Sequence, residues 1–412
     1  MQYVSLIQMY VGFIVNAILF FSHGLITYKE FSFYFAFVSA FFILYYFFFL
    51  IKQKIRLIKV FIGCLIFVLL YYYSSSYYAE LSKWYNSYFL VLLGQSIPVV
   101  LTAVIVSEKS KIQENIKILT PYLALIFTFI AFDVTFNPKE AALGLSGDEE
   151  ANLNYQATSY MAAYASAFAG YYLINKNKIH WHIFFRFSVW KYVMSLLILL
   201  NFVIILMTGG RGGLVVFVIQ FLFFLFLLKS IYRHPFFSIK TIVIIVLIGI
   251  GFYYGFNFVL SSNLESSGFE RFFDLAQEES VIERSVIMKK AIDAFFESPI
   301  IGHGIGAVLN EVGIYSHNIF MDFLVDTGVI GCFFVLVFIV WIFYKGFCLI
   351  RLDSSNCLWL IVFLDGFIMS QFSAYYLSSF PMLWVAAFIA SYSLDNFQPL
   401  TILHNKRSSL SF

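Results

Sequence analysis

The hydrophobic residues of this chain fall in blocks of about 20 residues, separated by short polar segments. Runs such as Phe31 to Ile51 and Leu214 to Leu228 are apolar throughout and lack the alternation of a half-buried strand. A helix of about 20 apolar residues crosses about 30 Å of hydrocarbon, whereas a barrel would show alternating segments of about ten residues. The pattern therefore predicts an all-α, polytopic transmembrane protein with about 12 spans. The predicted spans are residues 3–22, 31–51, 57–75, 87–106, 117–136, 157–174, 188–207, 213–229, 241–260, 318–345, 356–375 and 379–395.

Composition supports the membrane assignment and narrows the possible functions. Hydrophobic residues make up 61% of the chain and charged residues 12%, against about 25% charged in soluble domains. The first apolar block has no basic residue before it and no small-residue cleavage site after it, which predicts a retained helix. The net charge is only +3 and the chain has no RNA- or DNA-binding motif, which argues against nucleic acid as a partner. The four cysteines lack CxxC spacing, so we expect neither a zinc site nor a disulfide framework.

The basic residues predict the topology. With the N-terminus in the cytoplasm, most of the 26 Lys and Arg residues fall in one alternating set of loops, as the positive-inside rule requires. That set contains Lys52, Lys54, Arg56, Lys59, Lys109, Lys111, Lys117, Lys176, Lys178, Arg186, Lys191, Lys229, Arg233, Lys240, Lys345, Arg351, Lys406 and Arg407. Both termini should then be cytoplasmic.

One of the external loops is long enough to carry chemistry. The chain divides into helices 1–9 (residues 1–260), a large periplasmic loop (261–317), and helices 10–12 with a short tail (318–412). Long loops without a function are uncommon, so we expect the 261–317 loop, partly helical, to be functional.

A glycine-rich turn carries the first candidate residue. Thr208-Gly209-Gly210-Arg211-Gly212-Gly213 joins two spans on the external side. Its glycines would let the backbone approach a ligand, and the following helix would point its partial positive end there. Arg211 adds a planar charge suited to phosphate. The alternative is a tight turn with an arginine that reaches to the membrane surface.

The second candidate lies on a predicted amphipathic helix from Val281 to Glu297, which Ser298-Pro299 would end. Its expected apolar face contains Val281, Met288, Ala291, Ile292 and Phe295, and its polar face Glu283, Lys289, Lys290, Asp293 and Glu297. Arg284 falls in the middle of the apolar face. An inward arginine needs an anionic partner, either a carboxylate of the protein or an anionic substrate.

The remainder of the loop holds a glycine run and a histidine. Gly302-His303-Gly304-Ile305-Gly306 resembles a nucleotide-binding run, but it lacks the preceding strand and the downstream acid, so we interpret it as a flexible turn. His317, at the external edge of the next span, is able to accept a proton from a sugar hydroxyl. A lone histidine there is more often a capping or interfacial residue.

Three further features are weaker. His180-Trp181-His182 lacks a third ligand, so a metal site is not expected. Asp365 lies within a span, where it would serve as a proton relay or pair with a polar group on a neighbouring helix. No Asp-x-Asp motif indicates metal-bound nucleotide-sugar chemistry, and we expect neither a metal nor another cofactor.

Taken in order, three segments resemble the bacterial O-antigen polymerase and O-antigen ligase superfamily of membrane glycosyltransferases. They are Thr208-Gly209-Gly210-Arg211-Gly212, Arg284 followed by Ser298-Pro299-Ile300-Ile301-Gly302-His303-Gly304-Ile305-Gly306, and His317-Asn318-Ile319-Phe320 followed by Asp326-Thr327-Gly328-Val329-Ile330-Gly331. The resemblance covers residues 208–331. This chain has Gly210 where relatives often have serine, and Asp326 where they often have glutamate.

The resemblance implies a substrate, a location and residue roles. The donor would be an oligosaccharide linked through diphosphate to undecaprenol, used at the periplasmic face of the bacterial inner membrane. Arg211 and Arg284 would clamp the diphosphate, and His317 would deprotonate the acceptor hydroxyl for attack with inversion. Supporting positions in the motifs are Gly210, Gly212, Gly304, Asn318 and Asp326.

Several functions remain open at this stage. The motifs do not separate polymerase from ligase, which transfers glycan to lipid A core. We favour the polymerase because the chain is aromatic-rich and has no appended acceptor-recognition domain. A flippase for the same lipid-linked sugar would instead be expected to place its site near the bilayer midplane and to have repeated halves. Expected partners are the lipid-linked glycan and membrane lipid, with a chain-length regulator protein as a further candidate.

Overall fold

The computed structural model describes residues 55–78, 80–136, 153–230 and 279–392, all discussed below. The predicted spans 3–22, 31–51 and 241–260, and the first part of the long loop, lie outside these residues. Within them the secondary structure is helical and contains no strand. Six helices are long and apolar enough to cross a membrane, which confirms the all-α, multi-pass fold class. The total of about 12 spans stays a prediction.

Helices occur at each predicted span within the described ranges. They are α4 (Ile55–Ser75), α5 (Lys83–Val91) continuing through the π-turn Leu92–Ser96 into α6 (Ile97–Ser107), α7 (Ser110–Phe136), α9 (Leu153–Asn175), α10 (Val189–Thr208), α11 (Arg211–Ser230), α16 (Ile319–Leu352), α17 (Cys357–Met369) and α18 (Phe380–Ser391). The long loop adds α14 (Glu279–Glu297) and α15 (Val308–Glu311).

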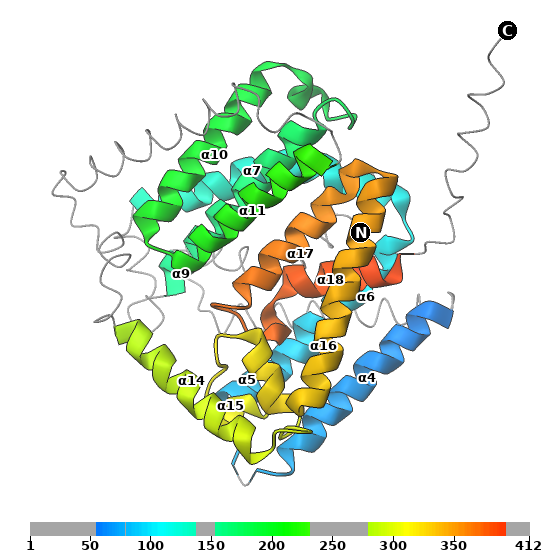
Figure 1. The fold of residues 1–412 in the computed structure, drawn as a ribbon. Coiled ribbons are helices and arrows are strands. Elements are labelled where there is room, and N and C mark those ends of the chain that lie inside the picture. Colours follow the sequence, from blue (N-terminus) through cyan, green and yellow to red (C-terminus); the bar gives the residue numbers. More distant parts are fainter. Residues whose placement is uncertain (1–54, 79, 137–152, 231–278, 393–412) are drawn as a thin grey trace.

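Helix α9 is the centre of the larger helix group. It packs against α7, α10 and α11, and Figure 1 shows these four helices side by side. Residues 158–172 of α9 are all buried, and its alanines and Gly170 keep the packing surface small. Small residues let helices approach closely where no hydrophobic effect drives them together, as in a bilayer.

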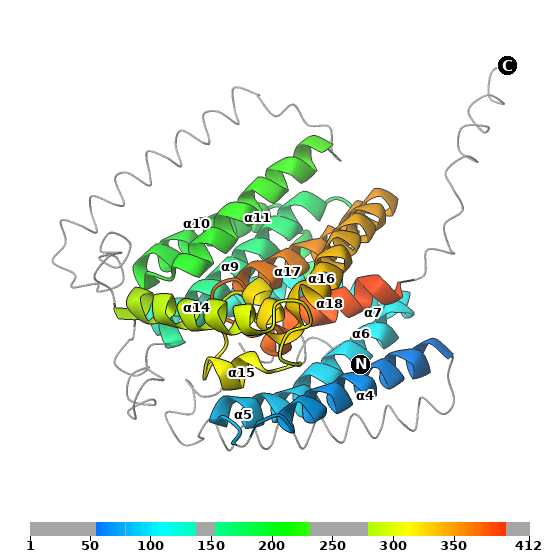
Figure 2. The ribbon, with the colours of Figure 1, turned by 60° about the horizontal axis from the view of Figure 1, so that its bottom comes forward.

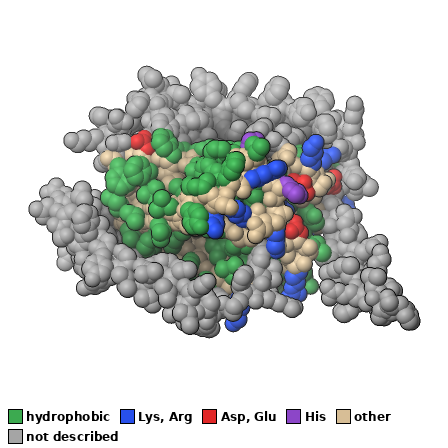
Figure 3. Space-filling model, turned by 90° about the horizontal axis from the view of Figure 1, so that it is seen from above, with side chains coloured by type: hydrophobic (Ala, Val, Ile, Leu, Met, Phe, Trp, Pro, Cys, Tyr) green, Lys and Arg blue, Asp and Glu red, His purple; other side chains and the backbone are tan. Residues whose placement is uncertain are grey.

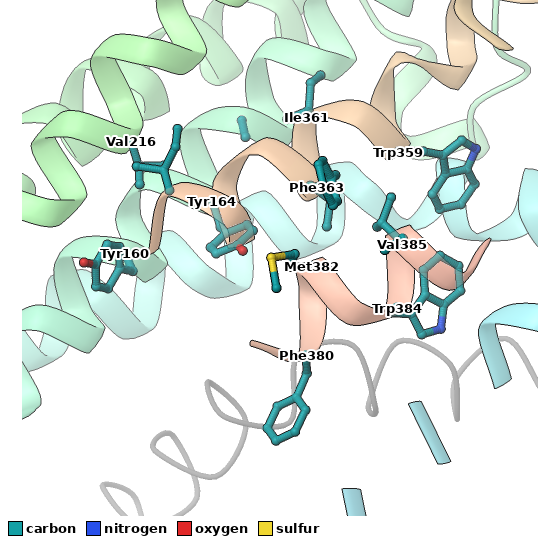
Figure 4. Close-up of a cluster of buried hydrophobic side chains, with 14 of the residues drawn as sticks. Tyr160, Tyr164, Val216, Trp359, Ile361, Phe363, Phe380, Met382, Trp384 and Val385 are labelled. Atoms are coloured by element: carbon teal, nitrogen blue, oxygen red, sulfur yellow. The ribbon is translucent and has the colours of Figure 1, made fainter. Parts of the chain in front are cut away.

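Helices α17 and α18 form a second core with α6, α11 and α9. Figure 4 shows large side chains of the two helices, such as Phe363 and Trp384, packed between the neighbouring helices. The indoles of Trp359 and Trp384 lie 5.6 Å apart, and both are buried. This core lies next to the segment that joins α17 to α18, residues 370–379.

That joining segment differs from the prediction. The spans expected at 356–375 and 379–395 are helices of only 13 and 12 residues, or about 20 Å each at 1.5 Å per residue. Between them, residues 370–379 contain only a short 3₁₀ turn, Tyr376–Ser378. The backbone leaves the helix here because the protein supplies its hydrogen bonds: the Ser96 hydroxyl donates to the Leu377 carbonyl at 2.6 Å. Non-helical backbone within a membrane requires such burial in protein.

Three of the loops that the charge pattern predicts to share one side lie together in the described part of the chain. Lys117 Nζ lies 3.4 Å from Asp353 Oδ2, and Lys178 Nζ donates to the Ser354 hydroxyl at 2.7 Å. Figure 3 shows Lys and Arg side chains gathered beside an apolar surface on this end of the molecule. The opposite end carries α14, α15 and the start of α5, as Figures 1 and 2 show.

Candidate functional site

Helix α14 follows the prediction closely. It ends at Glu297, directly before Ser298-Pro299, as expected from the sequence. Arg284 and Phe295 are half-buried and Ala291 is fully buried, so the predicted inward face is confirmed at these positions. The predicted polar residues, Glu283, Lys289, Lys290, Asp293 and Glu297, are exposed. Ile292 is wrongly predicted: it is 40% exposed, because the inward face turns toward Ala294 instead.

Arg284 and His317 act on each other electrostatically, although they come from opposite ends of the described loop. Burial and, to a lesser extent, the Arg284 charge lower the pKa of His317 from 6.5 to about 4, while the Phe372 backbone acts in the opposite direction. The same arginine lowers the pKa of the Tyr315 hydroxyl, which burial and Asp322 raise more strongly. Within the described ranges, no carboxylate forms an ion pair with Arg284. A neutral imidazole therefore faces a half-buried cation at neutral pH.

The backbone of His317 is held in an unusual conformation. Its φ of 60° makes it the one non-glycine residue with positive φ in the described part of the chain. Asp322 Oδ1 accepts the Ser316 amide at 2.7 Å, and the Asn318 side chain caps α16 by accepting the amides of Phe320 and Met321, each at 3.1 Å. The helix cap is thus Asn318 and not the histidine. Strained backbone of this kind is concentrated at functional sites.

The surroundings of the His317 ring leave one nitrogen for chemistry. The ring centroid lies 4.4 Å from that of Tyr315. Nδ1 is buried and has no hydrogen-bond partner among the described residues, and the same holds for Asp322 Oδ2. Because Nδ1 is unpartnered, the contribution of the Phe372 backbone reaches the ring through Nε2. If Nε2 carries the proton, Nδ1 holds the lone pair of the neutral ring.

The arginine turn is as tight as the sequence predicts. Helix α10 ends at Thr208, Gly209 adopts φ 68°, and α11 begins at Arg211. Two of the glycines, Gly212 and Gly213, lie close against α9. A Cβ on Gly212 would collide with the Tyr160 hydroxyl, and a Cβ on Gly213 would lie 2.6 Å from Ser159 of α9. They let α11 pack on α9, which fixes the position of the turn.

A polar cluster connects this turn with His317. The Ser373 hydroxyl lies 2.9 Å from the Tyr160 hydroxyl and donates to Gln156 Oε1 at 2.9 Å. The Ser373 carbonyl accepts from the Tyr315 hydroxyl at 3.2 Å. We call Gln156, Tyr160 and Ser373 the Ser373 cluster. Through it, three segments far apart in the sequence meet at one end of the helix bundle.

The glycine run is fixed to α16 and is not a flexible turn. The His303 amide donates to the Val325 carbonyl at 2.9 Å, and the Gly304 amide donates to that of Asp326 at 2.8 Å. Gly302, Gly304 and Gly306 all have positive φ, and a Cβ on Gly302 would lie 2.5 Å from the Asp326 backbone. Only glycine permits two backbones to approach this closely with these torsions.

Helix α16 is broken where this loop meets it. Gly328 has φ 63° and ψ −168°, so the predicted span contains a kink. The amides freed by the kink find new acceptors: Val329 donates to the Pro299 carbonyl at 2.9 Å and Ile330 to the Ile300 carbonyl at 3.3 Å. The carbonyls of the loop therefore accept the backbone amides that the break in α16 leaves without helical partners.

Asp326 is the centre of this arrangement. Its carboxylate is buried and accepts the amides of Gly306 at 2.9 Å and Val308 at 2.8 Å. It also accepts the hydroxyls of Tyr375 at 3.1 Å and Tyr376 at 2.8 Å. Its role is to hold the loop, α16 and the α17 to α18 connection together.

Some residues of the candidate site were not predicted from the sequence. Tyr315 lies beside His317 in the chain, and a search for polar residues at the start of an apolar span would have found it. Gln156 and Ser373 are separated by 217 positions, and only folding brings them together. Asp365 is fully buried and its carboxylate oxygens have no hydrogen-bond partner among the described residues, so both alternatives for its role stay predictions. His182 contacts the Tyr122 hydroxyl at 3.0 Å and Trp181 is buried, so that segment serves packing.

A comparison with known families matches the part of the chain that carries these residues. Residues 196–336 match a family model described as O-antigen ligase. This match supports the resemblance to the O-antigen polymerase and ligase superfamily. It covers about a third of the chain and includes Arg211, Arg284, His317 and Asp326. Neither the curated proteins nor the solved structures gave a match. The six apolar helices indicate a multi-pass membrane protein, and the matched family implies a glycosyltransferase-like enzyme with a lipid-linked glycan as its class of substrate.

Proposed function

We propose that this enzyme polymerises O-antigen, or a related surface polysaccharide, by transferring glycan from undecaprenyl diphosphate at the periplasmic face of the bacterial inner membrane. The observation that carries the proposal is the convergence of Arg284 and His317, with the Arg211 turn linked to them through the Ser373 cluster. A paired base and cations are what transfer from a diphosphate carrier requires.

The arginines stabilise the leaving group. As the anomeric carbon leaves the carrier, the bond between that carbon and the phosphate oxygen breaks and its electron pair stays on the diphosphate. Arg284, half-buried and without a carboxylate partner in the described ranges, has donors available for this charge. Arg211 is positioned at the start of α11, where the helix end adds partial positive charge. Fixed cations in a partly dry site supply this stabilisation without a metal.

His317 activates the acceptor. Its lowered pKa keeps the ring neutral at physiological pH, so the ring accepts the proton of the acceptor hydroxyl while that oxygen bonds to the anomeric carbon. Attack on the face opposite to the diphosphate inverts the configuration. Arrival of the anionic diphosphate raises the pKa of His317, which makes the ring a stronger base only when substrate is bound.

The location follows from the charge pattern. The end of the molecule with Lys117, Lys178 and Asp353 carries the loops rich in basic residues, and the candidate site lies at the opposite end. The positive-inside rule then puts both termini in the cytoplasm and the site in the periplasm. A chain-length regulator would meet the enzyme on that side.

The test is the lipopolysaccharide gel profile of a deletion strain complemented with wild type or with variants. Core bearing a single repeat unit in the deletion strain supports polymerase, and bare core with accumulated lipid-linked polymer would mean ligase. An unchanged ladder would reject both functions. We expect Arg211→Ala, Arg284→Ala and His317→Ala to abolish the ladder with normal membrane insertion, whereas Lys290→Ala, on the exposed face of α14, should restore it.

A further inference from the structure

The Ser373 cluster is built differently from the rest of the candidate site. Its three members contribute two hydroxyls and an amide, and Ser373 Oγ lies 2.9 Å from both Tyr160 Oη and Gln156 Oε1. Gln156 and Ser373 are partly exposed, whereas the ring of Tyr160 is buried. Hydroxyl and amide groups both donate and accept hydrogen bonds, as sugar hydroxyls do.

The position of the cluster is as informative as its chemistry. On one side, the Tyr160 hydroxyl fills the space left by the missing side chain of Gly212, next to Arg211. On the other side, Ser373 accepts from Tyr315, and the preceding residue, Phe372, acts on the His317 ring. The cluster therefore lies between the arginine turn and the histidine.

Transfer from a diphosphate carrier requires a sugar ring at such a position. The anomeric carbon must be within bonding reach of both the leaving phosphate oxygen and the attacking acceptor oxygen. If the arginines hold the phosphate and His317 the acceptor, the first sugar of the donor lies between them. We propose that Gln156, Tyr160 and Ser373 bind the hydroxyls of the sugar ring attached directly to the diphosphate, an inference that rests on the proposed function.

The experiment separates sugar recognition from diphosphate recognition. Purified wild type and the variants Ser373→Ala and Gln156→Ala are assayed with lipid-linked repeat unit isolated from a strain lacking the enzyme. Undecaprenyl diphosphate without sugar serves as a competitive inhibitor. We expect each variant to raise KM for the glycan-bearing donor about 5 to 10-fold, the effect of one lost hydrogen bond. The Ki of undecaprenyl diphosphate should stay within about twofold of wild type, because the arginines remain.

Arg284→Lys provides the comparison: it keeps the charge but loses the paired guanidinium donors, so it should raise the Ki of undecaprenyl diphosphate as well as the KM for the donor. Ser370→Ala is the matched control: Ser370 lies in the same connection, but its hydroxyl donates to the Gly366 carbonyl of its own helix at 2.8 Å. This control should leave KM unchanged.

The proposal is overturned if Ser373→Ala raises the Ki of undecaprenyl diphosphate as much as the KM for the donor. That result would mean that the cluster only positions the arginines. It is also overturned if KM does not change, or if Ser370→Ala raises it equally. Failure of undecaprenyl diphosphate to inhibit the wild type would instead reject the diphosphate site of the proposed function. If Ser373→Ala does not insert, Tyr160→Phe removes one hydroxyl of the cluster alone, with Tyr164→Phe, one turn away on α9, as its control.

Discussion

The carboxylate of Asp326 accepts the backbone amide of Gly306 at 2.9 Å, across 20 positions of sequence. This bond ties the glycine run of the long loop to the first turns of α16. Two tyrosine hydroxyls from the α17 to α18 connection converge on the same oxygen. The loop that leads to His317 is therefore fixed by hydrogen bonds to Asp326.

Replacing Asp326 should disturb the site through this scaffold. Asp326→Asn puts an amide donor where amides and hydroxyls already donate, so at least one buried donor loses its acceptor. An unsatisfied buried group costs about 1 to 3 kcal/mol. We expect a lower thermal unfolding temperature in detergent and loss of transfer, whereas Asp293→Asn, on the exposed face of α14, should change neither. A fully stable and active Asp326→Asn protein would contradict the scaffold role.

The glycine at position 212 offers a test of helix packing behind the arginine turn. A Cβ there would overlap the Tyr160 hydroxyl, so Gly212→Ala should displace Tyr160 from Ser373 and move Arg211. We expect transfer to fall at least tenfold in a complementation or in vitro assay. Gly63→Ala is the control, because nothing lies within 4 Å of a Cβ at that position of α4. Equal activity of the two variants would show that the packing at Gly212 is not required.

The pH dependence of transfer should reflect the lowered pKa of His317. A general base acts in its deprotonated form, so activity is lost as the pH falls through its pKa. With a free-enzyme pKa of about 4, kcat/KM should stay constant from pH 8 to well below 6.5 and then decline. The decline in kcat should occur at higher pH, because the bound diphosphate raises the pKa of the ring. A decline in kcat/KM at or above pH 6.5 would contradict a buried, neutral histidine in the free enzyme.

The cap of α16 should matter for the geometry of His317. Asn318 accepts two backbone amides at 3.1 Å, and loss of such a cap typically costs about 1 kcal/mol. We expect Asn318→Ala to lower stability and transfer, and Asn318→Asp or Asn318→Ser, which keep a capping oxygen, to retain both. Thermal unfolding together with the ladder assay measures this. Equal behaviour of the alanine and serine variants would show that the cap is not limiting.

The sequence was sufficient for the helical architecture and for the residue types of the site. The length of each apolar block is set by the thickness of the bilayer, so most spans in the described ranges begin and end within a few residues of their predicted positions. The faces of α14 follow from local periodicity, and Arg284 was placed on the correct face for that reason. Three of the basic segments predicted to share one side lie together, as the contacts of Lys117 with Asp353 and of Lys178 with Ser354 show.

Only the tertiary structure decided how these parts meet. The break at Gly328, the short helices α17 and α18, and the Ser373 cluster depend on hydrogen bonds between segments far apart in the chain. Local periodicity records whether a residue faces lipid or protein, but it does not record which other segment supplies the partner of a freed backbone group. The interaction between Arg284 and His317 also depends on tertiary structure, because the glycine run between them is held on α16.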